Sequence, residues 1–392
     1  MISDIDPTQV RRDFAVTRKT IYMNNGAIAP TPLSTIKATT DFMLKLSEEG
    51  PDTLLTAEYV TALLNELRTR VAHLINCDRD EVVLTQSTTE GLNVVAGGIG
   101  WKKGDSIVVR GGRHEHQANY FPWLAVSQKK GVALKELNID KDGFFSMDKL
   151  EKAIRGARLV TMTQVLYNTG AIMPLDQVGK IAKENNALFS VDAAQSVGTI
   201  PVDVRKIGCQ FLAFPGFKWL CGPLGIGIFY CSKQAAEMLN PRSIGGESAT
   251  LSDKGHALAE LGMPSRFQAG FRNYPGAAGL ESSLRYILRI GIGSIREMNM
   301  RVARVLREEI RKIPGVELCG PEEEDKRSSI VIFMPPSGSN SSEIVKRLEQ
   351  NNIVFAARDI GSGKKAVRAT PHFFNSEEEA MTAANYVKNL VK

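Results

Sequence analysis

The chain has 392 residues, which is too long for one simple core and predicts two domains, or one large domain with an appendage. With 43% hydrophobic and 23% charged residues, its composition is typical of a soluble globular protein. Its longest apolar runs fall short of the ~20 residues that span a bilayer. The net charge of +6 is spread thinly, without a long basic run, and the N-terminus is not a signal peptide, so we expect neither a nucleic acid nor a membrane as partner.

Between about residues 80 and 230, short β-rich runs alternate with helical patterns. Apolar strands separated by helices predict an α/β fold, with a largely parallel sheet covered on both faces. In such sheets, ligands bind at the carboxyl ends of the strands. The candidate strands are EVVLT, SIVVRG, VALKELN, RLVTMTQV, ALFSVDA, FLAF and IGIFYC.

After about residue 275 the pattern changes. Two long helical segments lead into two separated strands, SSIVIFMPP and NNIVFAAR. A last helix opens with Ser376 and Glu379 at the spacing of a capping box. These elements predict a smaller α+β domain.

The segment TQSTTEGLN follows the first strand and begins a helix, with Ser87 and Glu90 at capping-box spacing. A helix N-terminus just beyond a strand offers free N–H groups to a phosphate, and Thr88 and Thr89 add hydroxyl groups. The alternative is a well-capped helix without a ligand.

Two charged residues lie at the ends of later strands. Asp192 ends an apolar strand, where it either caps a turn or faces a cationic ligand atom such as a protonated ring nitrogen. Lys218 is the only charged residue in FPGFKWLCGPLGIG. It either extends outward into water or acts as a desolvated amine, which is nucleophilic toward carbonyl groups.

His114 and His116 follow the second strand. Their spacing alone does not support a metal site, because no cysteine or further histidine joins them. A single imidazole that stacks on a planar ligand, or acts as an acid or base, fits this strand end better. The five cysteines have no CxxC spacing and predict reduced thiols in a cytoplasmic protein.

The order of these motifs resembles the class V, fold-type I enzymes that use pyridoxal phosphate (PLP). This group includes cysteine desulfurases, isopenicillin-N-epimerase-like proteins and several aminotransferases. The resemblance runs from YMNNGAIAP to VRATPHFFNSEEE. It implies an arm over residues 1–20 that packs on the small domain, a large PLP-binding domain over 21–275 with a mostly parallel seven-stranded sheet, and a small α+β domain over 276–392. It also implies a homodimer with shared active sites.

The resemblance assigns roles to individual residues. Lys218 matches the lysine that forms the internal aldimine with PLP and then moves the substrate's α-proton. Asp192 matches the residue that keeps the pyridine nitrogen protonated, and His116 matches the histidine stacked on the ring. The other implied cofactor contacts are Thr88 and Thr89 at the phosphate, and Gln195 and Asn168 near the ring's 3-oxygen. The implied substrate contacts are Arg368 at the α-carboxylate, assisted by Arg358, and Asn25.

The phosphate end departs from the family pattern. Pro215 and Phe217 stand where relatives often place a phosphate-binding Ser and His, and Phe271 stands where the partner subunit usually supplies a Thr. We therefore hypothesise that Arg272 of the second subunit neutralises the phosphate.

The C-terminal region also departs, because the segment AARDIGSGKKAVRATPHFF lacks the mobile cysteine with which desulfurases attack the substrate sulfur. We expect a PLP enzyme that acts on a small amino acid through an external aldimine and α-proton abstraction, and specifically an aminotransferase. The alternatives are a desulfurase-like C–S lyase, an amino-acid epimerase, and a degenerate family member that only binds a ligand.

Overall fold

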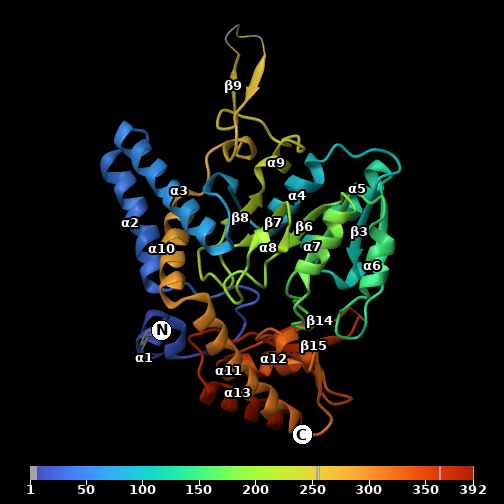
Figure 1. Ribbon diagram of the computed structural model, residues 1–392. Coiled ribbons are helices and arrows are strands. Elements are labelled where there is room, and N and C mark those ends of the chain that lie inside the picture. Colours follow the sequence, from blue (N-terminus) through green and yellow to red (C-terminus); the bar gives the residue numbers. More distant parts are fainter. Residues whose placement is uncertain (1–6, 253–254, 256, 362, 392) are drawn as a thin grey trace.

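The computed structural model describes residues 7–252, 255, 257–361 and 363–391. At its centre is a seven-stranded sheet in the order β2-β8-β7-β6-β5-β3-β4 (Figure 1). All of its strands run in one direction except β8, which is antiparallel to both neighbours. This confirms the predicted fold class. The strands are β2 (Val82–Thr85), β3 (Ser106–Arg110), β4 (Ala133–Leu137), β5 (Leu159–Thr163), β6 (Leu188–Asp192), β7 (Phe211–Pro215) and β8 (Gly227–Cys231).

Both faces of this sheet are covered, because neighbouring residues of a strand point to opposite sides. On one face, Val83 and Val109 pack in a core that helices α4 and α5 complete. On the other, Leu84 and Val108 pack in a larger core with α3, α6 and α7. The helices are α3 (Leu54–Ile75), α4 (Thr88–Gly98), α5 (Gln117–Lys130), α6 (Met147–Ile154), α7 (Leu175–Glu184), α8 (Val204–Ile207) and α9 (Lys233–Ala236).

A second, antiparallel sheet lies in the C-terminal part, in the order β11-β12-β15-β14. Its own hydrophobic core joins it to helices α11, α12 and α13. The predicted capping box at the start of α13 is present, with Ser376 and Glu379 bonded reciprocally. The elements are α11 (Ile292–Arg311), β11 (Glu317–Cys319), β12 (Val331–Met334), α12 (Ser341–Gln350), β14 (Ala356–Asp359), β15 (Lys365–Ala369) and α13 (Glu377–Leu390).

The N-terminal segment lies against this C-terminal part. Strand β1 (Ile21–Tyr22) pairs in parallel with β13 (Ile353–Val354). Arg11 of helix α1 (Pro7–Asp13) forms an ion pair with Glu379 at 2.8 Å, and Phe14 packs on Phe374 with ring centroids 4.5 Å apart. The domain boundaries at residues 20 and 275 stay a prediction.

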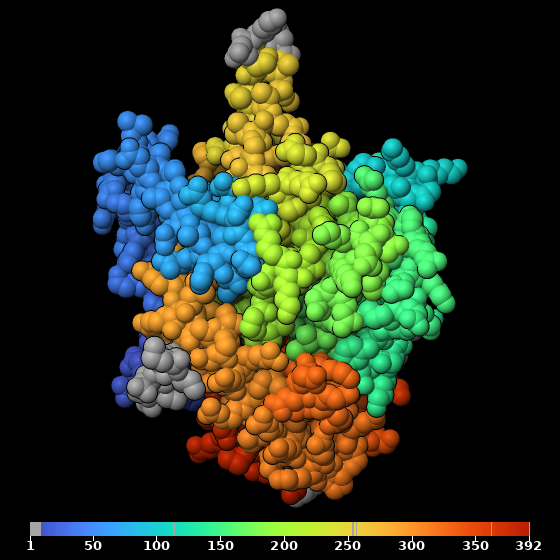
Figure 2. Space-filling view, viewed as in Figure 1, coloured from blue at the N-terminus to red at the C-terminus, as the bar shows by residue number. Residues whose placement is uncertain are grey.

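Two further features complete the fold. Helix α10 (Tyr274–Ile290) packs against α2 (Leu33–Glu49) and α3 beside the large sheet (Figure 1). The hairpin of β9 (Ala249–Leu251) and β10 (Leu258–Glu260) projects from the body of the molecule (Figure 2). Among the described helices, none is long and apolar enough to cross a membrane. Short 3-10 turns lie at Ala15–Arg18, Arg79–Glu81, Gly112–His114, Ser265–Phe267 and Glu324–Lys326.

Candidate active site

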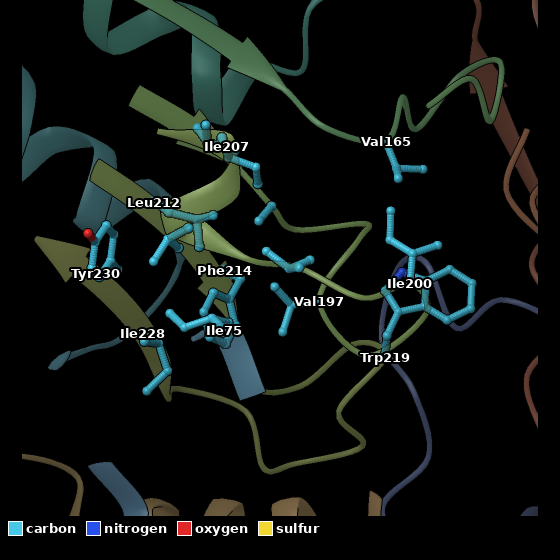
Figure 3. Close-up of a cluster of buried hydrophobic side chains, with 14 of the residues drawn as sticks. Ile75, Val165, Val197, Ile200, Ile207, Leu212, Phe214, Trp219, Ile228 and Tyr230 are labelled. Atoms are coloured by element: carbon cyan, nitrogen blue, oxygen red, sulfur yellow. The ribbon is translucent and has the colours of Figure 1, made fainter. Parts of the chain in front are cut away.

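Lys218 lies in the turn that follows β7, at the carboxyl end of the sheet. Its carbonyl accepts a hydrogen bond from the Cys221 N–H at 2.8 Å, which closes the turn. The next residue, Trp219, is buried beside Ile200 in the main core (Figure 3). The indole Nε1 donates to Gln195 Oε1 at 2.8 Å, so the residue after Lys218 is fixed by both packing and a hydrogen bond.

A cavity of about 140 Å³ lies beside Lys218. Its walls come from the segments that follow β2, β3, β5, β6 and β7, where the sheet topology places ligands. Most of the predicted cofactor residues meet here. The lining residues are Ser87, Thr88, Thr89, His116, Ala118, Thr163, Tyr167, Asp192, Ala194, Gln195, Pro215, Phe217 and Lys218.

The two charged strand-end residues have perturbed pKa values. Asp192 is 2% exposed, and burial raises its pKa to about 6, although its Oδ1 accepts from the Ala194 N–H at 2.8 Å. Burial lowers the pKa of Lys218 to about 8; the negative charge of Asp192 opposes this shift, and the positive charges of Arg368 and Arg358 add to it. The Lys218 amine is therefore partly neutral near physiological pH, as a nucleophilic lysine needs to be.

His116 is the N-cap of α5, and its Nδ1 accepts from the Ala118 N–H at 3.2 Å. Burial, together with the positive charges of Lys218 and Arg368, lowers its pKa to about 4. The imidazole is therefore neutral near pH 7, with its proton on Nε2. Its ring stands edge to face with Tyr167, at 5.0 Å between centroids.

A buried ion pair supports this side of the cavity, and sequence reasoning did not find it. Arg110 Nε lies 3.4 Å from Glu115 Oε2, and both side chains are almost fully buried. Glu115 Oε1 accepts from the His116 N–H at 3.0 Å and from the Thr163 hydroxyl at 2.5 Å. Glu115 thereby fixes the backbone of His116. Its position beside the histidines was the only available signal, and nothing in the sequence distinguished it from a surface acid.

The start of α4 forms the end of the cavity that suits an anion. Ser87 Oγ accepts from the Glu90 N–H at 3.3 Å, but Glu90 Oε2 accepts from Gln86 N–H, so the predicted capping box is only half formed. The first turn of a helix leaves N–H groups without intrahelical acceptors. Gly227 lets the backbone approach, since a Cβ there would lie 2.9 Å from Ser87. Thr88 is buried and Thr89 is exposed.

Not every predicted residue reaches the cavity wall. Asn168 does not line it; its Nδ2 contacts the His114 carbonyl at 3.4 Å, and its neighbour Tyr167 lines the cavity instead. Gln195 donates from Nε2 to the Gly26 carbonyl at 2.8 Å, in addition to accepting from the Trp219 indole. Asn25 donates to the Thr370 carbonyl at 2.8 Å.

Arg368 projects from β15 toward the cavity wall and is 2% exposed. Its Nη1 donates to the Tyr167 carbonyl at 3.3 Å, while Nε has no partner among the described residues. Arg358, on the neighbouring strand β14, is half-buried. Arg272 lies apart from the cavity, where Nη2 donates to the Phe267 carbonyl at 2.9 Å and Nη1 lies 3.8 Å from Glu90.

The five cysteines lie within the described ranges, and none of them lines the cavity. Three are buried, and burial raises their thiol pKa values. Cys77 and Cys319 are half-buried, with pKa values raised to about 12 and about 11. Across the part of the chain that the structure describes, no cluster of three or more His, Cys, Asp or Glu could hold a metal ion.

The fold and this lysine–aspartate site define a PLP-dependent enzyme of fold-type I, as the comparisons with known proteins show. The class-V aminotransferase family matches residues 21–380, and the chain belongs to that family. A probable cysteine desulfurase from Pyrococcus abyssi is 35% identical over 401 residues, which covers 98% of each chain.

Solved structures agree with this assignment. The apo structure of a cysteine desulfurase from Thermococcus onnurineus NA1 superposes with a TM-score of 0.92 at 33% identity, covering 100% of this chain and 99% of that one. Two structures of the cystine C–S lyase C-DES have TM-scores of 0.90 and 0.88 at 24% identity, covering 97% and 95% of this chain and 99% and 98% of theirs, and so share the fold. In the first of these, glycine is linked covalently to the PLP cofactor, and the second contains cysteine persulfide.

The residues of the cavity fit PLP. A partly neutral lysine amine suits the cofactor's aldehyde, and a buried carboxylate suits a protonated pyridine nitrogen. The start of α4 suits the phosphate. Two buried polar atoms next to the site, Arg368 Nε and Asn25 Oδ1, have no partner among the described residues, as expected where a polar ligand completes the site.

Proposed function

We propose that this enzyme cleaves the C–S bond of a cysteine-type amino acid. The observation that carries the proposal is the likeness, along nearly the whole chain, to a relative named as a probable cysteine desulfurase. The relatives favour C–S cleavage over the aminotransferase that we expected from the sequence. Bound PLP would supply an aldehyde for the substrate's amino group and a ring that withdraws electrons from Cα.

The chain's own residues divide the work. We assign the α-proton to Lys218 Nζ, because this amine is partly neutral and lies at the cavity wall. Asp192 would hold the protonated ring nitrogen, and the neutral imidazole of His116 would cover the ring. Arg368 would receive the substrate's α-carboxylate as a bidentate pair through its unpartnered Nε. The remaining proposed contacts are Thr88 and Thr89 to the phosphate, Gln195 and Asn168 near the ring oxygen, and Asn25 to the substrate.

The positions of the cysteines bear on where the sulfur goes. No cysteine side chain lines the cavity, and all five thiols have raised pKa values, so none is a ready nucleophile. We therefore infer that sulfur leaves the site on a small molecule and not as a persulfide on this chain.

Product analysis tests this function. The purified PLP-loaded enzyme is incubated with L-cysteine and L-cystine, with and without an α-keto acid, and sulfide, persulfide, pyruvate and alanine are measured. C–S cleavage that needs no keto acid supports the proposal, and amino transfer that needs one, without any sulfur release, refutes it. Lys218→Ala should abolish the reaction. Lys233→Ala, at an exposed lysine paired with Asp78, is the matched control.

We also propose that the active form is a homodimer in which Arg272 of the partner subunit approaches the phosphate. Pro215 and Phe217 line the cavity but offer no side-chain donor, and within one chain Arg272 does not line the cavity. A complementation experiment tests the exchange. If Arg272 acts across the interface, mixing Lys218→Ala with Arg272→Ala chains restores about a quarter of the wild-type sites, because half of the dimers are mixed and each holds one intact site.

If mixing restores nothing, while Arg272→Ala alone is impaired, Arg272 acts within its own chain. If Arg272→Ala alone keeps full PLP affinity, the residue has no role at the phosphate. The cytoplasmic location and the absence of nucleic-acid and membrane partners stay predictions.

A further inference from the structure

The turn that carries Lys218, here called the lysine turn (residues 217–221), is held from outside. Three of its carbonyl groups accept hydrogen bonds from distant parts of the chain: the N-terminal segment, helix α10 and the loop that follows β15. In chain order, these bonds run from the Ala29 N–H to Phe217 at 2.9 Å, from the Ser283 hydroxyl to Leu220, and from His372 Nε2 to Trp219 at 3.0 Å. The bond from His372 joins the lysine turn to the C-terminal part of the fold.

The lysine turn also contains backbone strain, which its surroundings must hold in place. Cys221, which ends the turn, has a φ of 56°, in the left-handed region that disfavours a residue with a side chain. Such a conformation persists only where the surrounding structure over-determines it. Gly198 packs so closely against the turn that a Cβ there would lie 2.7 Å from the Trp219 carbonyl oxygen. The shape of the turn therefore depends on contacts from outside it.

His372 is a buried imidazole with a partner for each ring nitrogen. It is 0% exposed. Nε2 faces a carbonyl oxygen, which can only accept, so Nε2 carries the proton. Nδ1 is then an acceptor, and the Asn299 amide of α11 donates to it at 3.3 Å. Burial lowers the pKa of His372 to about 3, so the ring stays neutral at working pH and serves as a fixed N–H donor.

Packing limits where this ring can lie. It stands edge to face with Trp219 at 5.2 Å between centroids, and with Phe373 at 4.4 Å. It does not line the cavity, so it can act on the site only through other residues. Among the residues that the structure describes, no other group donates to the Trp219 carbonyl. Without the imidazole this buried carbonyl would be unpaired, a state that the turn can relieve only by shifting.

The segment that carries His372 is itself anchored. It follows directly on β15, the strand that carries Arg368. Between these two residues, the Thr370 N–H donates to the Met23 carbonyl at 2.7 Å, and the Thr370 carbonyl accepts from Asn25 at 2.8 Å. One short, fixed segment therefore connects the lysine turn with the arginine that we propose for the substrate's carboxylate.

We propose that His372 is a positioning residue for Lys218. Its N–H donor fixes the Trp219 carbonyl and thereby holds the Lys218 amine at the cavity wall, where PLP attaches. The imidazole touches neither substrate nor cofactor and moves no proton. The proposal rests on the role proposed above for Lys218, but not on the identity of the substrate. Our sequence-based expectations assigned no role to His372.

The test measures how fast cofactor-free protein attaches PLP. The limiting rate at high pH reports geometry, because the Lys218 amine is then neutral whatever its pKa. His372→Gln keeps an amide donor near the position of Nε2, whereas the shorter His372→Asn cannot reach the Trp219 carbonyl. His372→Leu removes the donor altogether. Ser341→Ala is the matched control, because it removes a hydroxyl bond of 2.6 Å to the Lys365 carbonyl, outside the lysine turn.

The variants at position 372 should separate by the reach of their donors. His372→Asn and His372→Leu should lower the limiting rate by about 10- to 100-fold, and His372→Gln and Ser341→Ala should stay within about threefold of wild type, since a displacement of about 1 Å costs about 100-fold. The visible circular dichroism of bound PLP supplies a second readout and should change in the same two slow variants. If His372→Leu fails to fold, the Gln and Asn variants still decide the question.

The outcomes keep the two proposals apart. If Lys218→Ala still retains PLP on the denatured protein after borohydride reduction, the role of Lys218 fails, and the positioning proposal fails with it. If Lys218→Ala retains none but His372→Gln is as slow as His372→Asn, only the positioning role is refuted. It is also refuted if the Asn variant is as fast as wild type, or if Ser341→Ala is equally slow, because general loosening then explains the loss.

Discussion

The lowered pKa of Lys218 predicts how fast the cofactor attaches at each pH. An ordinary lysine has a pKa of 10.5, and burial lowers the value here to about 8. At pH 7 about one amine in ten is then neutral, against about one in 3,000 for an ordinary lysine, a gain of about 300-fold. Because only the neutral amine attacks the aldehyde, the attachment rate should be lost as the pH falls through about 8.

The assay mixes cofactor-free protein with PLP between pH 6 and 10 and follows the initial rise in absorbance. Nα-acetyl-lysine amide, whose amine has a pKa of about 10.4, provides the reference curve, and Lys218→Ala provides the background. Two variants give the sign of the neighbouring charges. Asp192→Asn removes a negative charge that raises the lysine pKa, so the midpoint should fall below that of the wild type, and Arg358→Gln should raise it. A wild-type midpoint above about 10, or a rise in Asp192→Asn, would refute the reasoning.

Three predictions concern stability. Gly198→Ala should lower the free energy of unfolding by more than about 1–2 kcal/mol, which is the cost of a positive φ alone for a residue with a side chain. The backbone φ here is +100°, and in addition an alanine Cβ would lie only 2.7 Å from the Trp219 carbonyl oxygen. Gly208→Ala, at φ +72° with open space around it, is the control in urea unfolding, and equal losses would contradict the argument. Burial lowers the pKa of His372 to about 3, so only the unfolded chain takes up its proton below about pH 6.5. This group should therefore lower the free energy of unfolding by about 1.4 kcal/mol for each unit that the pH falls below about 6.5. His372→Gln should reduce the slope of unfolding free energy against pH in this range by the same amount, and an unchanged slope would show that His372 does not contribute. Arg110→Met should destabilise by about 3–5 kcal/mol, because it leaves a buried carboxylate unpaired. The double variant with Glu115→Gln should recover most of this loss in the same unfolding assay, and no recovery would mean that packing dominates.

The large sheet could be predicted from sequence because each strand is buried on both faces and appears as a short apolar run. All seven predicted runs contain strands of the sheet. The direction of β8 was not predicted, although the chain from β7 to β8 contains no helix and a parallel crossover needs one. The β9–β10 hairpin was also missed. Its strands are three residues long and largely exposed, so they have no apolar alternation to detect.

The site was predictable where a strand end fixes the side chain and less so where a loop does. Asp192 is the last residue of β6 and Lys218 lies in the turn after β7, so their position at the carboxyl edge follows from the fold. Tyr167 and Asn168 are neighbours in an irregular loop, and only the folded backbone decides that the tyrosine lines the cavity. The pairing of Arg358 with Arg368 likewise depends on the register of β14 and β15, which residues far apart in the chain determine.

The distribution of charge around the cavity explains how one site can keep Lys218 reactive and still bind anions. Asp192, whose pKa burial raises to about 6, is still mostly ionised at pH 7, and its negative charge opposes the effect of burial on Lys218 without cancelling it. The two arginines lower the pKa of Lys218 without contributing a group that could accept its proton. When an anionic substrate neutralises them, that contribution weakens, and the pKa of Lys218 should rise. Substrate binding would then strengthen the amine as a base at the moment when the α-proton must be removed. Cofactor-free enzyme saturated with a monocarboxylic amino acid such as L-norleucine should therefore show a higher Lys218 pKa than the free protein, and an unchanged value would contradict this coupling between the arginines and the lysine.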